Sequence, residues 1–159
     1  MKNENEIYYG DKKSFAIRFL KNENSKFAFC HLMLAEKIIG DINETCYLGT
    51  WKNSIEILKQ EIEKGNFKVD KYKIFENKSD AEIFDLIWNE NQDYRILQVS
   101  IDETIDAYLL SLIEKNGMLK FLWKGLREPC PENQIGKLYI IEINTEKVLK
   151  TIENALLDI

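Results

Sequence analysis

The residues of this chain that could act as nucleophiles or metal ligands are few and widely spaced. The sequence holds one histidine, His31, and three cysteines, Cys30, Cys46 and Cys130. A lone histidine cannot anchor a typical zinc site without cysteine or carboxylate ligands. Cys30 would not join His31 in such a site, because neighbouring residues of a strand face opposite sides. We therefore predict a structural role for His31 and no bound metal.

Nucleophilic chemistry by cysteine requires a thiol with a lowered pKa, as found beside a base or at the start of a helix. Cys46 lies a few residues before a predicted helix and is the best candidate. Free cysteines are more often small buried side chains, so packing is the favoured interpretation, and a small hydrolase using Cys46 stays an alternative. Cys130 lies between two prolines, which predicts a thiol on a rigid surface loop.

Pairs of carboxylates are the other candidates for catalysis. Glycoside hydrolysis needs two such groups facing each other across a cleft. With 27 acidic residues in the chain, close pairs are expected by chance, and a solvated acidic face is the favoured interpretation. The glycines do not cluster into a phosphate-binding loop, so we predict no cofactor. The pairs are Asp80 with Glu82, Asp102 with Glu103, and Glu103 with Asp106.

The net negative charge is concentrated in one stretch of the sequence. Between Glu76 and Asp106 there are nine acids and two bases, a net of -7, whereas the other eighteen acids and twenty bases give +2, and the sum is -5. Such a stretch attracts a basic partner and repels the phosphates of nucleic acid. We predict a protein-binding surface with carboxylates at Asp80, Asp85, Asp102, Glu103 and Asp106, and with Trp88 and Tyr94 as aromatic anchors.

The composition is typical of a globular protein. Of 159 residues, 45% are hydrophobic and 31% are charged, so a single domain spanning 1–159 can bury its own core. The chain begins with polar and acidic residues instead of a secretory signal, and no apolar run approaches the roughly 20 residues of a membrane helix. The odd number of cysteines indicates a reducing compartment. We predict a cytoplasmic protein without membrane contact and leave its oligomeric state open.

Strands and helices must position these candidate residues, and several are visible in the hydrophobic pattern. Alternating or continuous apolar residues predict strands at 15–20 and 27–34, with an extended piece at 8–11 before them and a short strand at 36–40 after them. Apolar residues at helical spacing predict a helix over 50–65, which ends at a glycine.

The second half of the chain contains the clearest hairpin, because Asn116-Gly117 is a typical tight turn between two apolar runs. Strands in runs, with helices between the runs, predict an α+β single domain with a mostly antiparallel sheet and two to three helices packed on it. The remaining predicted elements are an irregular strand at 67–75, a short helix with a capping box at 79–82, strands at 94–100, 108–113, 118–123 and 138–143, and a last helix that Thr145 would cap.

Several short motifs, in this order and spacing, resemble the immunity protein 42 family of bacterial polymorphic-toxin and contact-dependent growth inhibition systems. The resemblance covers most of the chain, although no motif matches toxin-contacting residues of the family. The motifs are Tyr9-Gly10-Asp11 followed by Phe15-Ala16-Ile17-Arg18-Phe19, then Ile38-Ile39-Gly40-Asp41 with Glu44-Thr45-Cys46-Tyr47-Leu48, and finally Phe121-Leu122-Trp123-Lys124.

The resemblance implies a small cytoplasmic inhibitor that binds one cognate toxin stoichiometrically and is not an enzyme. Many toxins of such systems are nucleases with basic substrate-binding surfaces, and the acidic stretch suits a partner of that kind. A generic intracellular adaptor protein is the remaining alternative.

Overall fold

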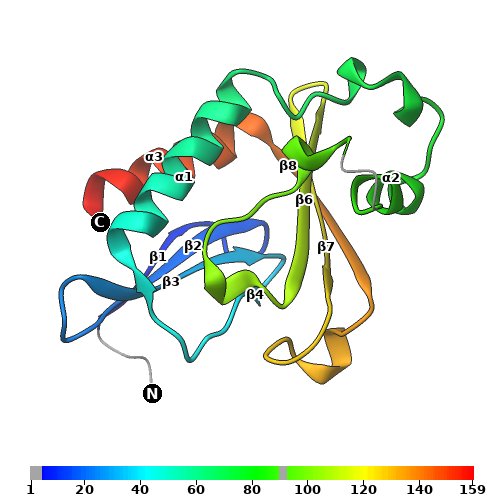
Figure 1. Ribbon diagram of the computed structural model, residues 1–159. Helices are drawn as coiled ribbons and strands as arrows, with labels where there is room; N and C mark the ends of the chain where they lie inside the picture. The colour runs from blue at the N-terminus through cyan, green and yellow to red at the C-terminus, as the bar shows by residue number, and fades with distance from the viewer. Residues whose placement is uncertain (1–4, 90–92) are drawn as a thin grey trace.

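The strands of the protein form two antiparallel sheets. The computed structural model in Figure 1 describes residues 5–89 and 93–159. The first sheet has the order β1-β2-β3-β4, and the short strand β5 pairs with the far end of β3. Its strands are β1 (Glu6–Gly10), β2 (Phe15–Lys21), β3 (Phe27–Leu34), β4 (Lys37–Ile39) and β5 (Cys46–Tyr47).

The connection between β3 and β4 forms without the usual turn residues. Ala35 and Glu36 have positive φ angles of 49° and 66°, a conformation that favours glycine or asparagine. The preceding loop supplies support, because the Ala35 amide donates to the Ser14 carbonyl (3.1 Å) and the Glu36 amide to the Lys12 carbonyl (2.8 Å). Tertiary hydrogen bonds therefore hold a turn that the local sequence does not favour.

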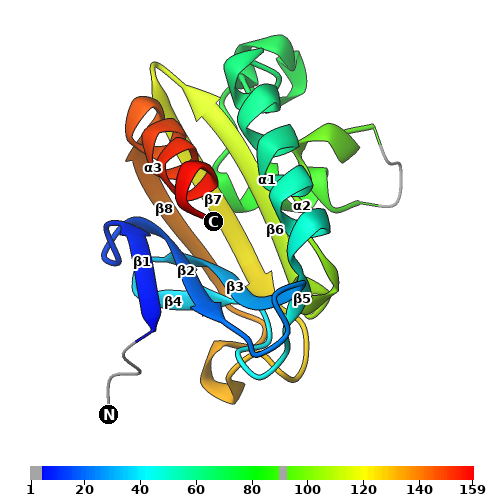
Figure 2. The same ribbon diagram turned by 90° about the vertical axis from the view of Figure 1, so that its left-hand side faces the viewer.

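The second sheet consists of β6 (Tyr108–Lys115), β7 (Met118–Gly125) and β8 (Leu138–Asn144), in that order. The predicted Asn116-Gly117 turn joins β6 to β7, with positive φ angles of 53° and 73°. Figure 2 shows the three strands side by side, with β8 at one margin of the sheet.

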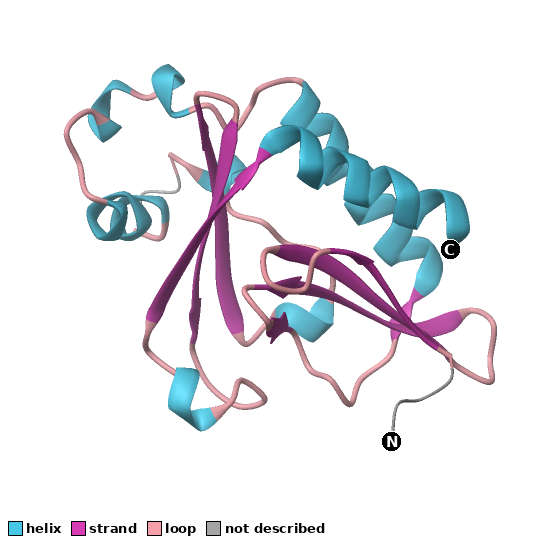
Figure 3. Ribbon diagram, turned by 180° about the vertical axis from the view of Figure 1, so that it is seen from behind, coloured by secondary structure: helices cyan, strands magenta, loops and turns pink. Residues whose placement is uncertain are grey.

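Three α-helices occur in the described residues: α1 (Leu48–Glu63), α2 (Asp80–Ile87) and α3 (Thr145–Asp158). Helices α1 and α3 lie side by side, and α3 also contacts β1, β2 and β8 (Figures 1 and 3). Helix α2 packs against the opposite face of the second sheet, where the Lys124 ammonium of β7 lies 5.3 Å from the centre of the Phe84 ring. No helix in the described ranges is both long and apolar enough to cross a membrane.

One continuous core joins the two sheets. Phe15 of β2 stacks on Phe121 of β7 with ring centres 5.5 Å apart. The helical spacing of Trp51, Ile55, Leu58 and Ile62 on α1 places all four side chains in this core, as the sequence predicts. The other large side chains that are almost fully buried include Trp123, Ile17, Leu32, Leu34, Leu97 and Leu110.

The predicted α+β class with antiparallel strands is confirmed, but two predicted strands are wrong. Segment 67–75 forms the 3-10 turns η1 (Val69–Lys71) and η2 (Lys73–Phe75), and segment 94–100 contains η3 (Arg95–Leu97). Each segment meets β6 through one isolated bridge, at Lys68–Glu114 and at Gln98–Ser111. Their apolar residues fill space beside the edge of β6 and do not extend the sheet.

Two smaller predictions also need correction. Helix α3 is capped by Asn144, whose side chain accepts from the Lys147 amide (3.3 Å), because the Thr145 hydroxyl instead donates to Glu114 Oε2 (2.8 Å). Cys130 is 2% exposed and is no surface thiol. The loop folds back on β7 because Gly125 leaves room, and a Cβ there would lie 2.2 Å from the Cys130 sulfur.

Candidate functional site

The single histidine belongs to a buried polar network. Arg18 of β2 donates to His31 Nδ1 (3.1 Å) and pairs with the Glu6 carboxylate, and the His31 Nε2–H donates to the Asp41 carbonyl (2.8 Å). Because a guanidinium can only donate and a carbonyl can only accept, these partners require the neutral ring protonated on Nε2. Burial lowers the pKa of His31, which agrees with the neutral form. The structural role predicted for His31 fits this arrangement.

The cysteines are built into the core. Cys30 and Cys46 lie on the paired strands β3 and β5, and the hydrogen bond that the Cys30 thiol donates to Cys46, together with burial, raises the pKa of Cys30. The Cys46 thiol lies 3.4 Å from the Ala28 carbonyl, and its own burial fits the packing interpretation. His31 faces the other side of β3 and does not activate Cys30. Within residues 5–89 and 93–159, no three histidine, cysteine or carboxylate side chains gather as a metal site.

The acidic stretch of the sequence divides into two groups in space. The first group lies at α2. Asp80 forms an ion pair with Lys120 of β7 (2.9 Å), and Glu82 lies 3.9 Å from Lys78. Asp85 is exposed. The carboxylates at the start of α2 are therefore largely balanced by lysines that the fold brings to them.

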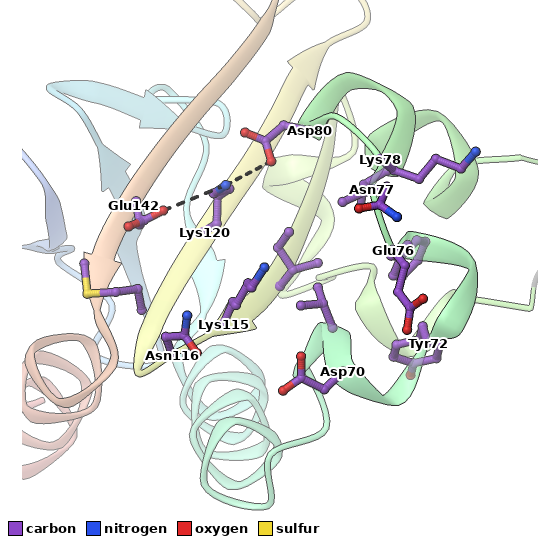
Figure 4. A pocket seen from close by; sticks show the side chains of 15 residues that line it. Asp70, Tyr72, Glu76, Asn77, Lys78, Asp80, Lys115, Asn116, Lys120 and Glu142 are labelled. Carbon is purple, nitrogen blue, oxygen red and sulfur yellow. Dashed lines mark hydrogen bonds and ion pairs between the residues drawn. The ribbon is translucent and has the colours of Figure 1, made fainter.

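A cavity of about 520 Å³ separates this helix start from the β6–β7 hairpin. Figure 4 shows Lys120 between Asp80 and Glu142, which lies 3.8 Å from the ammonium group. The residues that line the cavity include three bases, Lys78, Lys115 and Lys120, and four acids, Asp70, Glu76, Asp80 and Glu142, so it carries little net charge.

The two predicted aromatic anchors lie near α2 and are half-buried. Trp88 packs against Phe84, with ring centres 6.3 Å apart, and its indole N–H is buried without a partner in the described residues. Tyr94 packs edge-on to Tyr72 (5.7 Å) and against Phe75 (5.1 Å). Both rings contribute to the local packing, which leaves only part of each for a partner.

The second group of carboxylates lies at one end of the molecule, where three connecting segments meet. The Asp41 amide donates to the Thr104 carbonyl (2.8 Å), and the Leu126 amide donates to the Ala107 carbonyl (2.8 Å). We call segments 40–45, 102–107 and 126–137 together the carboxylate end, which lies in the lower part of Figures 1 and 2.

The carboxylate end holds seven acids and two bases, a net of -5, so the rest of the chain is neutral overall. Glu103 and Asp106 are exposed there, as are the apolar side chains of Ile42 (47%) and Leu126 (42%). Asp102 differs, because its Oδ1 accepts from the Thr104 amide (2.9 Å) and hydroxyl (2.6 Å) and caps η4 (Glu103–Ile105). Asp102 is thus a structural carboxylate as well as a charge.

Sequence reasoning predicted only part of this end. The residues that it missed are Asp41, Ile42, Glu44, Leu126, Glu128 and Glu132. They lie far from the acidic stretch in sequence, and no local pattern of charge marks their segments. Conversely, the prediction grouped four residues at or near α2 with residues of the carboxylate end, from which the fold separates them. These four are Asp80, Asp85, Trp88 and Tyr94.

The described residues define a small α+β protein with an acidic end, whose histidine and cysteines serve its core. Comparison with known proteins gives its family. The chain matches the family described as Immunity protein 42 over residues 7–157, and it belongs to this family. No curated protein sequence matches the chain.

A solved structure is also similar to the chain. It is the crystal structure of CdiI from Burkholderia dolosa AUO158, with a TM-score of 0.65 and 15% sequence identity. The similarity covers 96% of this chain and 100% of that chain. At this identity the similarity establishes a shared fold, which agrees with the expectation from the family resemblance.

Proposed function

We propose that this protein binds one cognate bacterial toxin in the cytoplasm of the producing cell and blocks it by stoichiometric association. The observation that carries the proposal is the family match, which spans nearly the whole chain. The buried histidine and cysteines support a binding role over catalysis, since each has its polar partners within the core. The protein is then an inhibitor and not an enzyme.

The carboxylate end supports a partner with a basic surface. A net charge of -5 is concentrated on three neighbouring segments, and exposed apolar side chains lie among the carboxylates. Carboxylates around apolar contacts steer a cationic surface and then exclude water from the interface. A toxin that acts on nucleic acid has such a surface, and we propose that the toxin is a nuclease whose phosphate-binding face is covered.

The proposal is tested by pairing the chain with the protein that the neighbouring gene encodes, taken as the candidate toxin. Cells that express this toxin alone should stop growing, and co-expression of the chain should restore growth. Light scattering of the mixed purified proteins should give the mass of a 1:1 complex. An equimolar amount of the chain should stop the toxin from degrading DNA or RNA. Growth arrest that persists despite soluble chain would contradict the proposed function.

A further inference from the structure

Strand β8 is an open sheet edge. It is seven residues long and pairs only with β7 on one side. Figure 3 shows β8 in front of β7 and β6 with no element lying over it. Three other edge strands are protected, because β4 and β5 have only three and two residues and β6 is bridged by segments 67–75 and 94–100. Strand β1 is also an outer strand but has only five residues.

The hydrogen-bond pattern between β7 and β8 shows which backbone amide and carbonyl groups of β8 point outward. The Thr145 amide donates to the Gly117 carbonyl (3.0 Å), one pair beyond Asn144–Met118 in the same register. Antiparallel partners alternate between hydrogen-bonded and non-hydrogen-bonded pairs. The odd-numbered residues of β8 therefore bond to β7, and Leu138, Ile140 and Glu142 direct their amide and carbonyl groups outward. Within the described residues, no backbone hydrogen bond uses these outward groups.

The side chains along the edge suit another strand. Within 138–144 the sequence is Leu-Tyr-Ile-Ile-Glu-Ile-Asn, without proline or glycine, and Ile140 is 41% exposed. Natural edge strands usually carry lysine, proline or a bulge that discourages pairing. Glu142 is the one charged residue of β8, and it is an acid.

Charge indicates which strand would pair here. Strand β8 begins at Leu138, immediately after segment 126–137 of the carboxylate end. A second copy of this chain would bring the same net charge of -5 and another Glu142, whereas a basic partner would bring the opposite charge. The edge and the carboxylate end thus form one continuous surface for a cationic partner.

We infer that β8 is the docking edge for an extended, basic segment of the toxin, which adds a fourth strand to the second sheet. This inference rests on the proposed function. The incoming strand bonds to the outward amides and carbonyls of Ile140 and Glu142, places apolar side chains near Ile140, and places a lysine or arginine near Glu142.

Backbone exchange tests this inference with the wild-type chain and an inactive variant of the adjacent toxin. Binding should slow amide hydrogen exchange at Ile140 and Glu142 by at least about tenfold, because these amides gain acceptors. The amides of Ile141 and Ile143, which already bond to β7, should change little. Protection without this alternation, or none in β8, would overturn the inference while leaving the proposed function intact.

A substitution provides the second test. Ile140→Pro removes one outward donor without removing a bond to β7, and proline is tolerated on edge strands at such positions. The variant should lose about tenfold in toxin affinity, whereas Ile140→Thr, which keeps the N–H group, should lose much less. Wild-type affinity in folded Ile140→Pro would overturn the inference, and so would a chain that dimerises through β8 without toxin. A wild-type chain that binds no toxin would instead overturn the proposed function, and the inference with it.

Discussion

The histidine network couples protonation to stability at the scale of single residues. Burial lowers the pKa of His31 from its ordinary 6.5, so the folded protein binds a proton less readily than the unfolded chain. The stabilisation is therefore complete above pH 6.5 and is lost as the pH falls towards the lowered value. Imidazolium would also lose the hydrogen bond that Nδ1 accepts from Arg18.

We predict that the free energy of unfolding decreases as the pH falls from 7.5 to 5.5, a window about one unit either side of 6.5. His31→Gln should be less stable at pH 7.5 by about 1–3 kcal/mol, because Arg18 and Asp41 lose a matched partner. Its stability should vary less across this range. Urea unfolding at three pH values measures both effects, and a wild-type stability that rises on acidification would contradict the prediction.

Gly10, in the first family motif, is required by close packing as well as by its backbone angle. Its φ is +91°, and a Cβ would lie 2.5 Å from the Phe15 carbonyl oxygen and 2.7 Å from Thr151 of α3. Gly136 is a matched control, because its φ is +76° but a Cβ would meet nothing within 4 Å.

Gly136→Ala should cost about 1–2 kcal/mol from backbone strain alone. Gly10→Ala should cost about 1–3 kcal/mol more from the clash, because backbone and α3 must both shift. Thermal or urea unfolding of the two variants gives the difference. Equal losses would show that the contact between the Gly10 turn and α3 adjusts freely.

At the scale of elements, a buried carboxylate joins the β6–β7 hairpin to the start of α3. Glu114 is 6% exposed, its Oε2 accepts from the Thr145 hydroxyl (2.8 Å), and its Oε1 has no partner in the described residues. Thr145→Val should destabilise the protein by about 1–3 kcal/mol, because the carboxylate loses its bond.

Replacing both partners should recover much of this loss, because two apolar groups of similar shape leave no buried polar atom unpaired. The double variant Glu114→Met with Thr145→Val should therefore be more stable than Thr145→Val alone. Chemical unfolding of the two single variants and the double variant measures the coupling. Additive losses would contradict the assigned contact.

At the scale of the whole molecule, the carboxylate end should set the rate of toxin association. Raising the ionic strength from about 0.05 to 0.5 M should lower the association rate about tenfold, because the Debye length shortens several-fold. Glu103→Lys with Asp106→Lys should lower the rate at low salt and flatten this dependence. Both side chains are exposed, so the melting temperature should stay nearly unchanged.

The matched control is Glu23→Lys with Glu153→Lys, an equal charge change at exposed positions away from the carboxylate end. It should reduce the rate less. Asp85→Lys tests the carboxylates at α2 separately and should lower the association rate even less than the control pair does. Stopped-flow or surface-binding kinetics distinguishes these variants. A larger effect at Asp85 than at the Glu103 and Asp106 pair would place the contact at α2.

The sequence by itself determined the elements whose periodicity and turn residues are strong. The strands at 15–20, 27–34, 108–113 and 118–123 and the helix over 50–65 follow from local pattern, since side-chain spacing matches the period of each structure. The structure of segments 67–75 and 94–100 does not follow from local pattern. Their few apolar residues fill gaps beside β6, and another part of the chain creates those gaps.

Only the tertiary structure decided how the charge is used. Charges that are neighbours in sequence separate in space, because Lys120 of β7 neutralises Asp80. Conversely, a loop that is distant in sequence brings Asp41 beside segment 102–107. Electrostatic fields depend on distances through space, which the order of residues does not give. The open edge of β8 likewise depends on which strands find partners, and that is settled only when both sheets are assembled.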